Sequence, residues 1–139
     1  MTRQKSRAAM VAPVDPRRKD SLSLFLYDTY LNQGVQIFFD ADNQVEFIEL
    51  SKSVTAVYHG FSVLGTIANN AIAEIAKDTP YDVSDPELGR RYVFPSLEMS
   101  FWRHAIPKPS DDSLEYAGRE FLTVGIGKRG YFSARGHDE

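Results

Sequence analysis

The clearest pattern in the chain is an alternation of apolar and polar residues on either side of an acidic stretch. Val35, Ile37 and Phe39 alternate with Gln36 and Phe38, which is typical of a β-strand, and residues 45–50 (VEFIEL) resume a strand. Between them lies DADNQ, in which Asp and Asn favour tight turns. We therefore predict a β-hairpin with an acidic loop over residues 35–50.

Further along the chain, one stretch has helical spacing and several have the character of short strands. Apolar residues recur at helical spacing between Thr66, a candidate N-cap, and Pro80, which cannot continue a helix. The predicted strands are a segment within YHGFSVLG (58–65) that its glycines interrupt or end, and residues 91–94, 97–102, 121–126 and 130–133.

The segment between residues 20 and 34 fits two structures. Leu24, Tyr27 and Leu31 lie at helical spacing, and Gly34 is placed where a helix would end. Residues 21–26 also alternate in part, which is a strand pattern. We favour the helix and keep the strand as the alternative.

This order of elements indicates an α+β fold. Runs of strands beside few helices are typical of an antiparallel sheet with one or two helices packed on one face. The chain has 139 residues, of which 42% are hydrophobic, and this suits a single domain, which we assign to residues 21–135. Residues 1–20 are predicted to be a disordered or extended basic tail.

The charges divide unequally between these two parts. Residues 1–20 hold six basic and two acidic side chains, a net +4, whereas the other 119 residues hold ten basic and seventeen acidic side chains, a net −7. An acidic domain repels phosphate, so we expect no nucleic-acid binding through the folded part. With neither a signal peptide nor an apolar run that could cross a bilayer, we expect a cytoplasmic protein without a membrane partner.

The candidate chemical motifs do not make a site. The absence of cysteine excludes disulfides and thiolate metal sites. Residues 125–130, GIGKRG, match a dinucleotide-binding pattern, but only nine residues follow, too few for the helix and strand that such a site needs, so we interpret the glycines as a hairpin turn. The hairpin spreads the carboxylates of Asp40, Asp42, Glu46 and Glu49 apart. We therefore expect no catalytic residue, no metal and no cofactor.

Large aromatic residues that break the alternation are more informative. Phe38 faces away from its apolar neighbours in the hairpin, and Trp102 faces away from Leu97, Met99 and Phe101. Exposed aromatic rings among charges are typical of protein interfaces, although a helix or the loop over residues 104–118 could also cover them. The predicted interface comprises Phe38, Trp102, Tyr92 and Glu98, with Asp40 and Asp42 attracting a cationic partner.

Three segments carry a resemblance. GVQIFFDADNQVEFIEL, YVFPSLEMSFWR and GYF together look similar to small uncharacterised bacterial α+β proteins and, more loosely, to α+β immunity proteins that neutralise a toxin by binding it. The resemblance implies a fold and a binding role but no site residue.

These observations together predict a non-enzymatic binding module, and the resemblance implies an immunity-like role for it. Its partner would be a second copy, giving a homodimer, or a basic client protein. The alternative is a small enzyme or ligand-binding domain, with a pocket between helix and sheet near His59 and His104 in which one of them, or Tyr58, meets a carboxylate.

Overall fold

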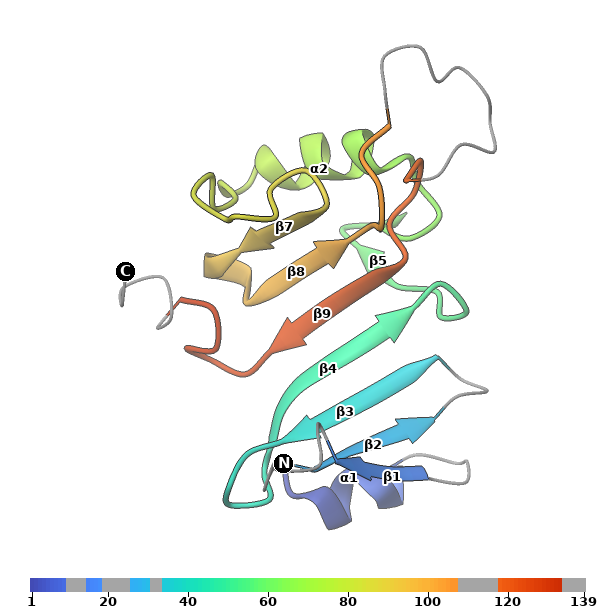
Figure 1. The fold of residues 1–139 in the computed structure, drawn as a ribbon, viewed down its shortest axis with the longest axis vertical. Helices are drawn as coiled ribbons and strands as arrows, with labels where there is room; N and C mark the ends of the chain where they lie inside the picture. The colour runs from blue at the N-terminus through green and yellow to red at the C-terminus, as the bar shows by residue number, and fades with distance from the viewer. Residues whose placement is uncertain (10–14, 19–25, 31–33, 108–117, 134–139) are drawn as a thin grey trace.

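The computed structural model describes residues 1–9, 15–18, 26–30, 34–107 and 118–133. Within them, seven antiparallel strands form one sheet in the order β1-β2-β3-β4-β9-β8-β7, accompanied by two helices and a two-stranded hairpin (Figure 1). The predicted α+β class is confirmed. The elements are α1 (Arg3–Ala9), β1 (Asp15–Arg18), β2 (Leu26–Tyr30), β3 (Val35–Phe39), β4 (Val45–Ser51), β5 (Val57–Tyr58), β6 (Phe61–Ser62), α2 (Ala68–Ala76), β7 (Arg91–Phe94), the 3-10 turn Pro95–Leu97, β8 (Met99–Trp102) and β9 (Thr123–Gly127).

The last strand lies in the middle of the sheet. β9 pairs with β4 on one side and with β8 on the other, so it joins the hairpin β3–β4 to the hairpin β7–β8. Figure 1 shows it in red between strands from earlier parts of the chain. Residues that are far apart in the sequence therefore become neighbours on the sheet surface.

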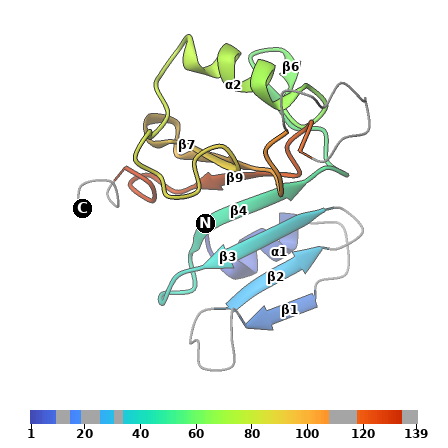
Figure 2. The ribbon, with the colours of Figure 1, turned by 45° about the horizontal axis from the view of Figure 1, so that its top comes forward.

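Both helices lie on one face of the sheet, which we call the helix face (Figure 2). Directly paired residues of adjacent strands point to the same side. Asp28, Ile37, Ile48, Ile126 and Met99 are successive partners across five strands, so they share this face. The helix α1 contacts the row at Asp28, whereas α2 packs near the β7–β8 end.

The helix face holds two apolar clusters. In the larger one, α2 contributes Ala71, Ile72 and Ile75, which pack with Phe94 and Phe101 of the sheet. The smaller cluster contains Tyr30, Ile37 and Phe39, and the Arg3 guanidinium lies 5.1 Å from the centre of the Phe39 ring. The opposite face, which we call the aromatic face, carries Tyr27, Phe38, Phe47 and Trp102.

The structure differs from the expected tail at the N-terminus. Arg3–Ala9 form a helix and Asp15–Arg18 form an edge strand of the sheet. The reason is an ion-pair cluster: Arg3 donates to the carboxylate of Asp28 at 2.7 Å, and Arg7 donates to it at 2.8 Å. Burial alone would raise the pKa of Asp28, but the hydrogen bonds from Arg7 and Arg3 and their charges outweigh it and lower that pKa. Basic residues that suggested a solvated tail therefore hold α1 on the sheet.

Three other expectations are corrected. Residues 26–30 are a strand, so the strand alternative for this region holds rather than the helix, whereas residues 20–25 and 31–33 lie outside the described part of the chain. Residues 130–133 form turns instead of a strand. The hydroxyl of Thr66 does not cap α2 and donates instead to the carbonyl oxygen of Ser62.

Other predicted elements agree with the structure. The hairpin β3–β4, the helix α2 and the strands β7, β8 and β9 occupy the expected segments, with shifts of a few residues at their ends. The YHGFSVLG segment contributes the short hairpin β5–β6, which turns at His59 and Gly60. No helix in the described residues is long and apolar enough to cross a membrane.

Replacing the buried carboxylate tests this account of α1. In Asp28→Asn, two guanidinium groups lose their counter-charge, so we expect the free energy of unfolding at pH 7 to fall by about 3 kcal/mol. Because folding lowers the pKa of Asp28, the stabilisation exists above its ordinary value of 3.8 and disappears as pH falls through the folded pKa.

Urea denaturation from pH 2 to 7 measures this difference. The control is Asp42→Asn, since Asp42 is exposed at the hairpin tip, and its effect should stay within about 0.5 kcal/mol. An equal effect of the two substitutions at pH 7 would contradict the role of Asp28.

Candidate functional site

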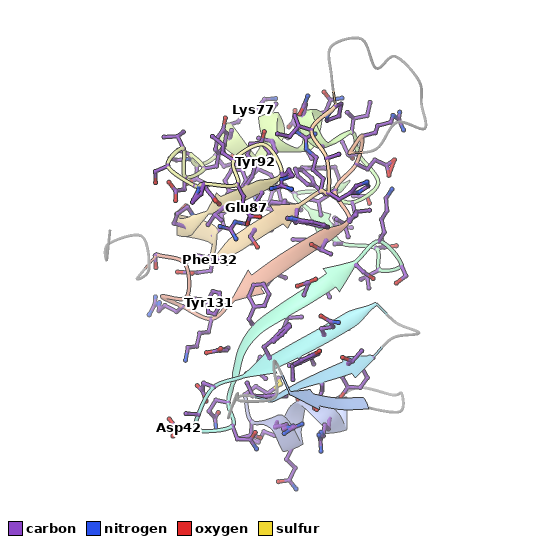
Figure 3. All side chains as sticks on the ribbon, viewed as in Figure 1. Asp42, Lys77, Glu87, Tyr92, Tyr131 and Phe132 are labelled. Atoms are coloured by element: carbon purple, nitrogen blue, oxygen red, sulfur yellow. The ribbon has the colours of Figure 1, made fainter. Side chains whose placement is uncertain are left out.

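A row of aromatic rings crosses the aromatic face. Tyr27 stacks on Phe38 with ring centres 4.9 Å apart, and Phe38 lies 5.7 Å from Phe47. Phe47 in turn stacks on Tyr131 at 5.1 Å and meets the edge of Phe132 at 6.0 Å. Figure 3 labels Tyr131 and Phe132 in the turn that follows β9. The row thus joins β2, β3 and β4 to a segment more than eighty residues later in the chain.

Two glycines of β9 make room for this row. A Cβ atom at Gly125 would overlap the ring of Phe47, and a Cβ atom at Gly127 would overlap Tyr131. Neither residue has a positive φ, and only Gly130 (φ 86°) occupies the turn conformation expected of all three. The interpretation of this glycine motif as a turn is therefore corrected for Gly125 and Gly127, which permit close approach of aromatic rings.

A groove with a volume of about 460 Å³ opens beside the row on the same face. Trp102 lies in it, as does the glycine surface of β9. A second, smaller hollow of about 170 Å³ adjoins it, and Glu49 lines both. The larger groove is lined by Phe47, Glu49, Arg91, Ser100, Trp102, Thr123, Gly125, Tyr131 and Phe132. The smaller hollow is lined by Thr29, Gly34, Val35, Gln36, Glu49 and Ser51.

Glu49 is the carboxylate that lines this groove. It is partly buried, and burial raises the pKa of its carboxyl above the ordinary value. Its side chain forms no hydrogen bond or ion pair with another described residue. Arg91 lines the same groove, but its guanidinium is bound to Asp85 at 2.8 and 2.9 Å and to Glu87 at 3.0 Å. The negative charge of Glu49 is therefore uncompensated within the described chain.

Glu98 supports the groove rather than lining it. Its backbone is left-handed (φ 53°), and its carboxylate accepts hydrogen bonds from the amides of Gly130 (2.9 Å) and Phe132 (2.7 Å) and from the hydroxyl of Ser133 (2.6 Å). Burial would raise the pKa of Glu98, but these hydrogen bonds lower it overall. The carboxylate thus holds the turn that carries Tyr131 and Phe132.

The other predicted interface residues lie in different places. Phe38 and Trp102 are on the aromatic face, as their alternation predicts. Tyr92 is on the helix face instead, where its ring meets Tyr81 at 5.0 Å. Asp40 accepts hydrogen bonds from Asp42 and Gln44 within the hairpin turn, an arrangement that lowers its pKa, and it also pairs with Lys128 at 3.2 Å. Asp42 is exposed at the tip of that turn (Figure 3).

The two described histidines do not line the groove. His59 lies 3.5 Å from the carboxylate of Asp78, to which Tyr58 also donates at 2.8 Å, but the His59 side chain is 71% exposed. His104 is exposed as well. Among the described residues, no group of His, Asp and Glu is arranged to hold a metal ion.

Comparison with known proteins adds no relative: the chain matches no protein-family model, no curated protein and no solved structure. The site is therefore argued from its own geometry. Phe47 could have been found from the sequence, because it faces Phe38 across the hairpin. Glu49 was dismissed among the scattered carboxylates, and no sequence signal placed Tyr131 and Phe132 beside Phe47.

The role of Glu98 can be tested by amide exchange. In Glu98→Ala, the amides of Gly130 and Phe132 lose their acceptor, so we expect their exchange to become at least tenfold faster, which corresponds to ~1.4 kcal/mol. The control is Glu74→Ala, because Glu74 is exposed on α2 and pairs there with Lys77. Unchanged exchange in Glu98→Ala would show that the turn is held by other contacts.

The uncompensated charge of Glu49 makes a prediction about stability. Folding raises the pKa of Glu49, so its protonated form is more compatible with the folded state than its charged form. The stability that protonation contributes is present at low pH and is lost as pH rises through the folded pKa. We expect Glu49→Gln to increase the free energy of unfolding at pH 7 by about 0.5–2 kcal/mol.

Urea denaturation between pH 3 and 7 measures this gain. The gain should vanish below the ordinary glutamate pKa of 4.5, where the wild-type carboxyl is protonated in both states. Glu46→Gln is the control, since Glu46 lies on the same strand but lines neither hollow, and its effect should stay within about 0.5 kcal/mol. A loss of stability in Glu49→Gln would mean that the carboxylate has a stabilising partner.

Proposed function

We propose that this chain is a non-enzymatic protein-binding module whose aromatic face binds a basic segment of a partner protein. The observation that carries the proposal is the ring row from Tyr27 to Phe132 beside a groove that holds the uncompensated carboxylate of Glu49. Large rings concentrate binding energy at protein interfaces, and a desolvated carboxylate favours a cationic partner.

The charge distribution supports a basic partner. The whole chain carries a net −3, and the 119 residues after the first twenty carry a net −7. The α1 cations Arg3 and Arg7 are already bound to Asp28. An acidic surface increases the rate of encounter with a cationic protein and disfavours nucleic acid.

The competing enzyme hypothesis has weaker support. Catalysis needs polar groups that converge in a cavity where water is excluded. The Tyr58–His59–Asp78 cluster has a plausible acid–base composition but lies at the surface, with side-chain exposure of 71% for His59 and 47% for Asp78. We therefore favour binding, and a basic toxin is one client that would suit the resemblance to immunity proteins. A cytoplasmic location remains a prediction.

Peptide selection tests the proposed function. We expect a random peptide library, selected on the immobilised full chain, to yield peptides rich in Lys and Arg. The chain has one tryptophan, Trp102, and it lies in the groove, so its fluorescence reports binding there directly. Phe47→Ala should weaken binding of these peptides at least tenfold, about 1.4 kcal/mol, because Phe47 links the ring row to the groove.

The matched control is Ile126→Ala. Ile126 is 41% exposed on the helix face of β9, between the two glycines of the aromatic face, and its replacement should change affinity less than about twofold. Equal affinity of wild type and Phe47→Ala would contradict the proposal. A second outcome would also contradict the proposal. If the wild-type chain dimerises in sedimentation experiments and Phe47→Ala abolishes the dimer, the aromatic face binds a second copy of the chain.

A further inference from the structure

We propose that the groove takes one arginine side chain of the partner, with its guanidinium paired to Glu49 and lying against the rings of Phe47 and Trp102. This inference rests on the proposed function and names the group that the aromatic face recognises.

The charge requirement comes from Glu49. Its carboxylate lies where the larger groove meets the smaller hollow, and it has no cationic partner among the described residues. A partly buried carboxylate without a counter-charge costs stability, and binding a cation removes that cost. The raised pKa of Glu49 is consistent with this, because burial is its only cause.

The one described cation in the groove does not fill this role. The Arg91 guanidinium makes two hydrogen bonds to Asp85 and an ion pair with Glu87. One positive and two negative groups leave that cluster with a net charge of −1. Arg91 therefore does not repel an incoming guanidinium and would need to break three contacts to reach Glu49.

The walls of the groove fit a planar cation. Phe47, Trp102, Tyr131 and Phe132 line it, and the faces of such rings attract cations and stack on guanidinium groups. A guanidinium is less strongly hydrated than an ammonium and matches a carboxylate with two parallel hydrogen bonds. These two properties favour arginine over lysine.

Hydroxyl groups line both hollows and can accept hydrogen bonds. Ser100 and Thr123 line the larger groove. Thr29 lines the smaller hollow and is only 3% exposed, and its Oγ1 has no hydrogen-bond partner among the described residues. A buried hydroxyl without a partner is uncommon in proteins. Thr29 lies two strands from Glu49, with Gln36 between them, on the far side of the smaller hollow.

The test uses a small probe, so it does not depend on any selected peptide. N-acetyl-arginine methylamide is titrated to tens of millimolar while Trp102 fluorescence and the amide resonances of Ser100, Thr123 and Gly125 are followed. We expect saturable binding with a millimolar dissociation constant. The citrulline analogue, which has the same shape without the charge, should bind at least tenfold more weakly, and the lysine analogue should also bind more weakly.

Variants of one strand complete the test. Glu49→Gln should reduce arginine-probe affinity at least tenfold, whereas Glu46→Gln should leave it within about twofold. Loss of binding in Glu49→Gln cannot be attributed to unfolding, because the same variant is expected to be more stable. The stability measurement described above checks this directly.

The outcomes separate the two proposals. If the citrulline analogue binds as tightly as the arginine probe, or if Glu49→Gln binds like wild type, the groove does not recognise arginine. Absence of probe binding overturns the inference as well. In each case, selected basic peptides that still require Phe47 would leave the proposed function standing, whereas failure of the peptide selection would overturn the proposed function.

Discussion

The insertion of β9 between β4 and β8 is the constraint on which the rest of the structure depends. It supplies both neighbours with backbone partners and joins two hairpins that would otherwise end in unpaired edges. The size of the β9 side chains also differs between the two faces of the sheet. Val124 is fully buried under α2 on the helix face, whereas Gly125 and Gly127 leave the aromatic face bare for Phe47 and Tyr131. One strand therefore closes a core on one side and shapes a groove on the other.

The pKa values of two buried or partly buried carboxylates shift in opposite directions. Asp28 is fully buried but has two arginine partners, so its pKa falls and its charge holds α1 against the sheet. Glu49 is partly buried and has no ion-pair partner among the residues that the structure describes, and burial raises its pKa, so its charge costs stability. A charged group that disfavours folding is a candidate for a role in binding. The contrast between these two residues is the strongest physical reason to look for a ligand at Glu49.

The sequence predicted the site only in part. Alternation placed Phe38 and Trp102 correctly on the face away from the helices, because the period of a strand is a local property. Tyr92 was wrongly assigned to that face, since its parity relative to Trp102 depends on the pairing of β7 with β8. Glu98 was predicted to be an interface residue. In the structure its backbone is left-handed, and its carboxylate points toward the turn at residues 130–133. Such long-range contacts leave no local pattern.

The sequence by itself determined the α+β class, the hairpin β3–β4, the helix α2 and the two-sided character of the strands, because turn chemistry and hydrophobic period act over a few residues. Only the tertiary structure decided that Arg3 and Arg7 bind Asp28, that Phe47 stacks on Tyr131, and that Glu49 is partly buried in the groove. Each of these facts depends on which distant segments meet. That is set by the packing of the whole sheet, with β9 at its centre.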